Sequence, residues 1–282
     1  MKKINVAAEA MLNQMLEKYQ YNGHNRSNSW EFCYETFKKY SEKKHLSEED
    51  YDFLAVHLAF YLASWGMYRA SSFLLCLDYR IHIDAIRIMM SKDYLNLFNA
   101  NLYEENEKEY IKMLFGNGNA VGVYAELNNY YKVIRDEINK HRKRKHYEDE
   151  ASETLITKIL LGVYGCVPAY DRYFKDGIGL FGGQKHLNSS GKAIWQNNSK
   201  GLLYILNKTD LGNEIKNGNI VSTYANYPFM KKVDMYFYLL GQSIEELADE
   251  YQENGYSKKE AIKKSKDEHY NAISKNYFKS EK

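Results

Sequence analysis

Residues 53–77 read FLAVHLAFYLASWGMYRASSFLLCL, and this apolar stretch decides the fold class. His57 and Arg69 are its only basic residues and it has no acidic one, and the uncharged part before Arg69 is shorter than the roughly 18 residues that a transmembrane helix needs. Just upstream, Ser47-Glu-Glu-Asp50 has the pattern of an N-terminal helix cap. The stretch therefore predicts a long core helix, a second helix after it, and no membrane span.

Helical spacing of apolar residues dominates the rest of the chain as well. Trp30, Cys33, Phe37 and Tyr40 follow one another at steps of four and three residues, as on one face of a helix. Only Thr223–Tyr227 hints at a strand. Further helices are expected over residues 6–19, 81–90, 104–115, 120–145 and 155–164, and after caps that begin at Ser243 and Ser257. We therefore expect an all-α protein, a multi-helix globular bundle.

The composition is that of an ordinary globular chain. Its 282 residues are 44% hydrophobic and 27% charged, which excludes a collagen-like or largely disordered protein. The net charge of +2 excludes a polycation that coats nucleic acid. A block of bases followed by acids, KHRKRKHYEDE at residues 140–150, either links two lobes, 1–146 and 150–282, or ends a helix inside one body. We expect a single helical domain over residues 1–282.

The cysteines and the first residues indicate the compartment. Cys33, Cys76 and Cys166 are too few and too widely spaced for a disulfide framework, so they are expected to be free thiols. Glu9 and Glu17 interrupt any signal-peptide core near the N-terminus. The sequence therefore predicts a cytoplasmic protein that does not associate with membranes.

Arginine is scarce, and its placement suggests a binding site. The chain has 31 lysines and only eight arginines, and four of these, Arg69, Arg80, Arg87 and Arg172, lie inside apolar runs. A guanidinium group in apolar surroundings needs a partner, and its fixed fork of donors suits carboxylate or phosphate. We therefore expect Arg69, Arg80 and Arg172 to converge as an anion clamp. The alternative is a structural ion pair between Asp171 and Arg69 or Arg80.

A set of polar and aromatic residues accompanies these arginines. His57, Tyr61, Ser64 and Tyr68 share one face of the apolar helix, where they either are core groups hydrogen-bonded to neighbouring helices or line a pocket. Pro168 should end a helix just before Tyr170, so that a second cluster faces the same pocket. The predicted ligand-binding residues are His57, Tyr61, Trp65, Tyr68, Arg69, Arg80, Tyr170, Asp171 and Arg172.

A glycine-rich stretch follows, over residues 176–192, and is expected to be a loop that covers the site. It contains a literal GxGxxG at Gly177, Gly179 and Gly182. A dinucleotide-binding fingerprint requires a strand before this motif and a helix directly after it, so the match is interpreted as accidental. No HExxH motif, metal-binding cysteine pair or GxSxG elbow is present, so no metal, cofactor or serine nucleophile is predicted.

One short segment is compatible with catalysis. The run Arg135-Asp136-Glu-Ile-Asn-Lys-His141 resembles the R-x(4–6)-H signature of the HEPN ribonucleases, which are all-helical enzymes that cleave RNA without metal. The resemblance covers seven residues. It implies that Arg135 stabilises phosphate charge and that His141 transfers a proton. The basic residues that follow would then contact RNA, or they form an ordinary solvated helix end.

Three functions follow from these patterns, and the sequence does not decide whether the protein is an enzyme. The leading hypothesis is a helical binding or regulatory protein that recognises a small anionic, nucleotide-like ligand or an acidic feature of a protein partner. The second is the HEPN-like ribonuclease, the only one with a nucleic-acid partner. The third is a protein-interaction module or inhibitor that acts through a partner or a homo-oligomer, with the charged helix Ser257–Phe278 as a possible docking element.

Overall fold

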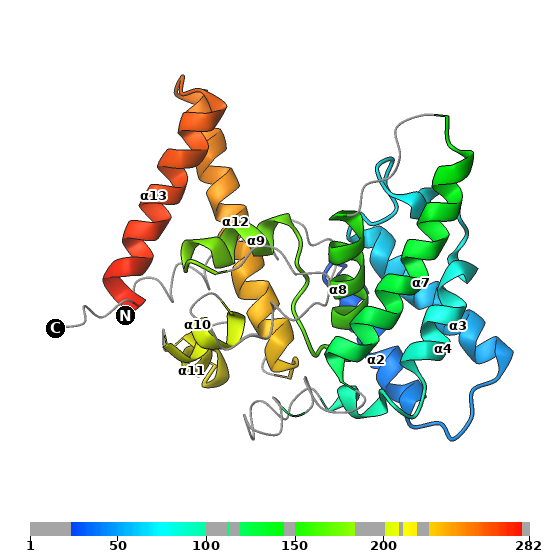
Figure 1. Cartoon of the computed structure of the whole chain (residues 1–282). Helices are drawn as coiled ribbons and strands as arrows, with labels where there is room; N and C mark the ends of the chain where they lie inside the picture. The colour runs from blue at the N-terminus through cyan, green and yellow to red at the C-terminus, as the bar shows by residue number, and fades with distance from the viewer. Residues whose placement is uncertain are drawn as a thin grey trace. The chain divides into compact units, whose positions relative to one another are not determined.

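The protein is all-helical throughout the described part of the chain (Figure 1). A computed structural model describes residues 24–99, 112, 119–143, 150–183, 201–208, 211–218 and 226–277. These residues form α-helices and short 3-10 helices and no strand, which confirms the predicted fold class. The helices expected over 6–19 and, apart from residue 112, over 104–115 lie outside the described residues, as do residues 223–225 of the expected strand.

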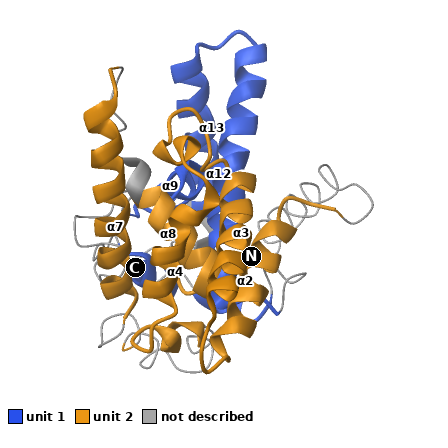
Figure 2. Cartoon of the chain, turned by 90° about the vertical axis from the view of Figure 1, so that its right-hand side faces the viewer, with its two compact units in different colours: residues 1–18, 170–282 blue, residues 19–169 orange. Residues whose placement is uncertain are grey.

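The chain divides into two compact units, which are coloured separately in Figure 2. Unit 2 comprises residues 19–169, and unit 1 comprises residues 1–18 and 170–282. The division falls between Ala169 and Tyr170, directly after Pro168, and not in the charged block at residues 140–150.

Unit 2 is a helix bundle built around α3. Its elements are α2 (Asn28–Ser41), α3 (Glu48–Ser64), η1 (Phe73–Cys76), η2 (Tyr79–His82), α4 (Ile83–Met89), η3 (Leu95–Phe98), α7 (Ala120–His141) and α8 (Glu150–Tyr164). Helix α3 packs against α2, α4, η2 and α8. It begins at the predicted cap, because the Ser47 hydroxyl accepts from the Asp50 amide while the Asp50 carboxylate accepts from the Ser47 amide.

Helix α3 ends just before Gly66. The second helix expected after it is shorter than predicted. Gly66 has a φ of 73°, a conformation that terminates helices and favours glycine. Only the single 3-10 turn η1 follows before residue 77, with Ser72 accepting from the Leu74 amide at its start. None of the described helices is both long enough and apolar enough to cross a membrane.

Long-range hydrogen bonds from aromatic side chains fix the helices of unit 2 to one another. The Trp30 indole on α2 donates to the Leu161 carbonyl on α8 over 2.8 Å. The Tyr164 hydroxyl donates to the carbonyl of Met89 over 2.6 Å. Because these groups are buried, each bond satisfies a carbonyl that water does not reach.

Unit 1 consists of α9 (Arg172–Leu180), α10 (Leu202–Lys208), α11 (Leu211–Lys216), α12 (Phe229–Glu253) and α13 (Lys258–Tyr277). Helices α9 and α12 cross at very short range. A Cβ atom at Gly241 would overlap the carbonyl oxygen of Tyr173, and one at Gly177 would overlap that of Phe237. Glycine is therefore required at both positions for the crossing.

Two sequence expectations for unit 1 are wrong. Residues 176–180 are not part of a covering loop but complete α9, because Asp171 caps the helix and Phe174 and Ile178 form its buried face. The GxGxxG motif thus lies in a helix and its C-terminal turn. Residues 184–200, the rest of the expected loop, lie outside the described residues.

The helix expected to begin at Ser243 begins instead at Phe229. Ser243 lies inside α12, and its hydroxyl bonds to the Leu240 carbonyl of the same helix. The apolar run from residue 229 onward keeps the helix continuous through residue 243. The cap pattern there therefore does not start a new helix. The cap at Ser257 is confirmed, since its hydroxyl accepts from the Glu260 amide.

Candidate functional site

The nine predicted ligand-binding residues are divided between the two units. His57, Tyr61, Trp65, Tyr68, Arg69 and Arg80 lie in unit 2, and Tyr170, Asp171 and Arg172 lie in unit 1. Neither unit by itself contains the whole set. A single site formed by all nine therefore stays a prediction.

The arginines of the predicted clamp are exposed, contrary to the expectation of apolar surroundings. The side chains of Arg80 and Arg172 are each 65% exposed. Arg80 Nε lies 3.0 Å from the carboxylate of Asp52, and an Arg172 nitrogen lies 2.5 Å from that of Glu245. The apolar neighbours in the sequence point inward on their helical turns, which leaves each guanidinium on the solvent side with its own carboxylate.

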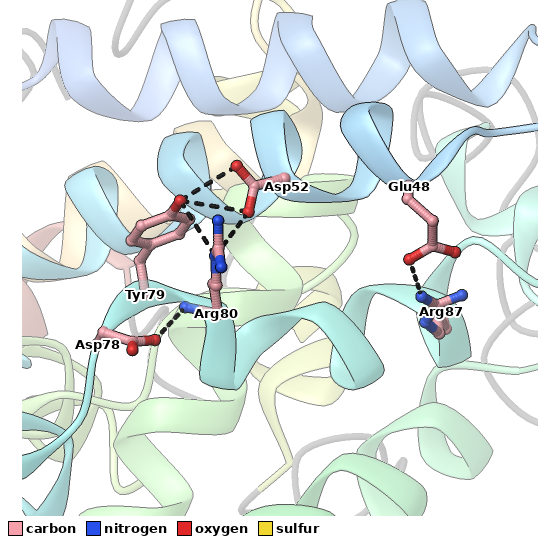
Figure 3. Close-up of polar contacts among 6 residues, drawn as sticks. All are labelled: Glu48, Asp52, Asp78, Tyr79, Arg80 and Arg87. Atoms are coloured by element: carbon pink, nitrogen blue, oxygen red, sulfur yellow. Dashed lines mark hydrogen bonds and ion pairs between the residues drawn. The ribbon is translucent and has the colours of Figure 1, made fainter.

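Arg69 and Arg87 are also exposed and have partners of their own. Arg69 Nε donates to the Ser71 hydroxyl over 2.9 Å. Arg87 lies 2.6 Å from Glu48 on α3, in an ion pair drawn in Figure 3 beside that of Arg80 with Asp52. These contacts fasten η2 and α4 to the first turns of α3.

Helix α3 ends at Ser64, so Tyr68 lies beyond it and not on the helical face predicted for it. The Tyr68 side chain instead joins a hydrogen-bonded chain through His82. The Tyr68 hydroxyl lies 2.8 Å from Nε2 of His82, and Nδ1 of His82 lies 2.7 Å from the Tyr131 hydroxyl. His82 is fully buried, and burial lowers its pKa to about 3. Burial also raises the pKa of Tyr68 to about 12. The group at the centre, His82, was not among the predicted residues.

The other residues predicted on that helical face are packed within their own helix bundle. Tyr61 is buried against Gly162 of α8, where a Cβ atom would collide with the ring. His57 packs on Phe53 with ring centroids 4.6 Å apart, and burial lowers its pKa. The Ser64 hydroxyl donates to the Phe60 carbonyl. Tyr68 thus bonds to a neighbouring element, as the alternative of satisfied core groups predicts, whereas Ser64 bonds within its own helix.

Trp65, directly after α3, lies between two cations. The guanidinium carbon of Arg26 is 4.5 Å from the indole centroid, and Lys158 Nζ on α8 is 5.2 Å from it. Lys158 is buried, whereas Arg26 is exposed. Cation–π contacts of this kind hold the end of α3 to the residues just before α2 and to α8.

In unit 1, the predicted residues begin helix α9. An Asp171 oxygen accepts from the Phe174 amide over 3.1 Å, which makes this carboxylate the N-cap of the helix. Tyr170 is buried and packs on Phe174 with centroids 4.7 Å apart. Glu245, which binds Arg172, also accepts from the Tyr173 hydroxyl, so this cluster joins α9 to α12.

The ribonuclease-like pair lies on α7 with contrasting environments. Arg135 is buried and pairs with Asp136 at 2.9 Å, whereas the His141 side chain is 80% exposed and lies 3.4 Å from Glu137. Six residues along a helix correspond to about 9 Å of rise and to faces about 120° apart. One chain therefore does not present both side chains on the same surface.

Helix α3 carries large apolar side chains on its solvent side. Phe53 and Val56 are each 45% exposed and Phe60 is 65% exposed, at spacings of three and four residues. Leu54, Leu58 and the other buried residues of α3 lie on the opposite side. The helix is thus apolar around most of its circumference, a pattern that is normal only where a helix is covered on all sides.

Charged and aromatic groups border this solvent-facing stripe, which we call the α3 stripe (Phe53, Val56 and Phe60). On the α2 side, Tyr40 stacks on Phe53 at 5.7 Å and Lys43 lies 4.2 Å from the centroid of the Tyr40 ring. On the other side, the Tyr79 hydroxyl donates to the carboxylate of Asp52 (Figure 3). An apolar centre with a rim of tyrosines and ion pairs is typical of protein–protein interfaces.

The sequence analysis did not identify the α3 stripe, because it assigned the whole apolar segment to the core. On the terminal helix, the other docking element considered, Ala261 and Ile273 are buried, whereas Tyr270 is 50% exposed. Among the described residues, no group of three or more potential metal-ligating side chains is placed to hold an ion.

No protein family, curated protein or solved structure matches the chain.

Proposed function

We propose that this protein is a helical interaction module that docks a helix of a protein partner onto the α3 stripe. The observation that carries the proposal is the exposure of Phe53, Val56 and Phe60 on one well-packed helix. The largest exposed apolar patch of a protein often marks an interaction site.

The size of the α3 stripe suits a reversible complex. With roughly 200 Å² for a phenylalanine and somewhat less for a valine, the exposed fractions amount to about 300 Å² of apolar surface. Burying that area is worth about 7 kcal/mol before the cost of association, which is itself about 4–15 kcal/mol. The rim must therefore contribute, through Tyr40, Tyr79 and the ion pairs beside them.

The spacing of the stripe selects the chemistry of the partner. Side chains at positions i, i+3 and i+7 of a helix are read by another helix with apolar residues at the same intervals. A small anionic ligand is less well supported, because Arg80 and Arg172 already have carboxylate partners. We place the protein in the cytoplasm, where its three free cysteines would stay reduced.

Site-specific photo-cross-linking in cells that make the protein tests this proposal. A photoreactive phenylalanine analogue is placed at position 60, and at position 133 as the matched control. Val133 on α7 is 61% exposed but stands among charged side chains such as Lys132 and Asp136.

We expect a discrete cross-linked protein from position 60 and none from position 133. The cross-linked partner should bind the purified chain, and Phe60→Ser should weaken that binding at least tenfold without lowering the melting temperature. Equal cross-linking from the two positions, or none from position 60, would refute the docking face.

A further inference from the structure

The α3 stripe has the geometry of a surface that pairs with itself. Phe53 and Phe60 are seven residues apart, which is about two helical turns, and Val56 lies near their midpoint. If two α3 helices lie antiparallel about a two-fold axis beside Val56, Phe53 of each copy packs on Phe60 of the other. Such an interface is isologous, because the same patch serves both partners.

The charges at the two ends of α3 favour the same antiparallel arrangement. Its first turn holds Glu48, Glu49 and Asp50, of which Glu48 already pairs with Arg87 and Asp50 with Lys43, so that Glu49 carries the charge argument; its last turn has no basic residue of its own. Beyond the last turn lie two exposed arginines, Arg26 over the Trp65 ring and Arg69 beside the Ser71 hydroxyl. An antiparallel pair brings the acidic start of each helix towards this basic end of the other, and it also opposes the two helix dipoles favourably.

A parallel pair would instead bring the two acidic ends together. Glu49 decides between these arrangements most clearly, because by helical spacing it lies in line with Phe53, Val56 and Phe60 on the exposed side. In a parallel pair, the two Glu49 carboxylates would face each other in the interface, with no cation between them.

From this complementarity we propose that the partner helix is α3 of a second copy of the chain, which makes the protein an antiparallel homodimer. The inference rests on the proposed docking function and names its occupant. The two stripes bury roughly 600 Å² between them, so the rim residues must supply the rest of the roughly 1,200 Å² that a stable interface needs. We therefore expect a dimer that dissociates at micromolar concentrations.

Disulfide scanning of the full-length chain tests the register directly. The exposed native thiol is first removed by Cys76→Ser, while the buried Cys33 and Cys166 are kept. Val56→Cys, next to the two-fold axis, should then cross-link to its own copy under mild oxidation. Val133→Cys on α7 is the control at an exposed site of similar size.

Cysteines at positions 53 and 60 test whether the two α3 helices run antiparallel or parallel. Phe53→Cys mixed with Phe60→Cys should give a mixed disulfide at least tenfold faster than Phe53→Cys alone, because only opposed Cα atoms come within about 7 Å. Faster self-linking of Phe53→Cys would mean a parallel pair and would overturn the proposal. Circular dichroism of each variant confirms that it is folded.

A monomeric mass for the wild type at high micromolar concentration, with Val56→Cys no more reactive than Val133→Cys, would also overturn the homodimer. In that case, cross-linking from position 60 to a different protein would leave the docking function standing. If position 60 captured nothing either, both the docking function and its occupant would fail.

Discussion

Acidification should destabilise unit 2 through the buried histidine. His82 is fully buried between the hydroxyl groups of Tyr68 and Tyr131. A neutral imidazole donates from one nitrogen and accepts at the other, so it can use one hydroxyl as acceptor and the other as donor. A charged imidazole would have to donate to both, in a site from which water is excluded.

The magnitude follows from the difference between the folded and unfolded states. Burial lowers the pKa of His82 to about 3 in the folded protein, against 6.5 for an ordinary histidine. Between these values, the unfolded chain binds a proton that the folded chain does not, so stability falls as the pH falls. At 1.36 kcal/mol per pH unit, the free energy of unfolding is lower by about 2 kcal/mol at pH 5 than at neutral pH, and this loss becomes small above pH 6.5.

Urea denaturation of the wild type and of His82→Gln from pH 7.5 to pH 4.5 measures this loss. Glutamine keeps a donor and an acceptor but does not titrate, so carboxylates that protonate in acid affect both proteins alike. We expect the variant to have a lower free energy of unfolding than the wild type at pH 7.5. At pH 5 this difference between the two proteins should be smaller by about 2 kcal/mol. A gap that stays constant, or an NMR titration of His82 near pH 6.5, would refute the reasoning.

Three further substitutions test the packing in each unit by thermal or urea denaturation. Gly241→Ala should cost at least about 2 kcal/mol, because the new methyl meets the Tyr173 carbonyl, whereas Gln242→Ala beside it should change little; equal effects would mean that the helices separate freely. Asp171→Ala should cost about 1 kcal/mol through the lost cap of α9, and an unchanged midpoint would contradict that role. Tyr164→Phe should cost about 1 kcal/mol, because a buried Met89 carbonyl loses its donor; no loss would show that water replaces the hydroxyl.

The helices could be predicted largely because their determinants are local. The cap at Ser47 and the apolar spacing from Trp30 to Phe37 act within one or two helical turns, and the structure confirms both elements. Prediction failed at Ser243, where a cap pattern lies inside a longer apolar helix. There the continuous packing of α12 outweighs the local pattern.

The candidate site could be predicted only in part, because burial is a property of the assembled bundle. Arg80 and Arg172 have apolar neighbours in the sequence but face solvent in the structure. His82 is surrounded in the fold by tyrosines from α7 and from the turn after α3, which its sequence neighbours do not reveal.

The exposure of the α3 stripe could not be predicted from the sequence for the same reason. The segment 53–63 reads as core on every face, and nothing in the sequence says which face lacks a neighbour. In the structure, α2, α8, α4 and η2 cover the other faces, and Phe53, Val56 and Phe60 remain exposed. Only the tertiary arrangement could identify the surface that we propose as the docking face.

Native mass spectrometry of the purified full-length protein weighs the docking face against the anion clamp in one measurement. If α3 holds two copies together, the wild type gives twice the 33.2 kDa of one chain, and Phe53→Ser combined with Phe60→Ser returns it to a single mass. A wild type found only as a single chain that carries a small anionic molecule, lost in Arg80→Ala, would contradict the account.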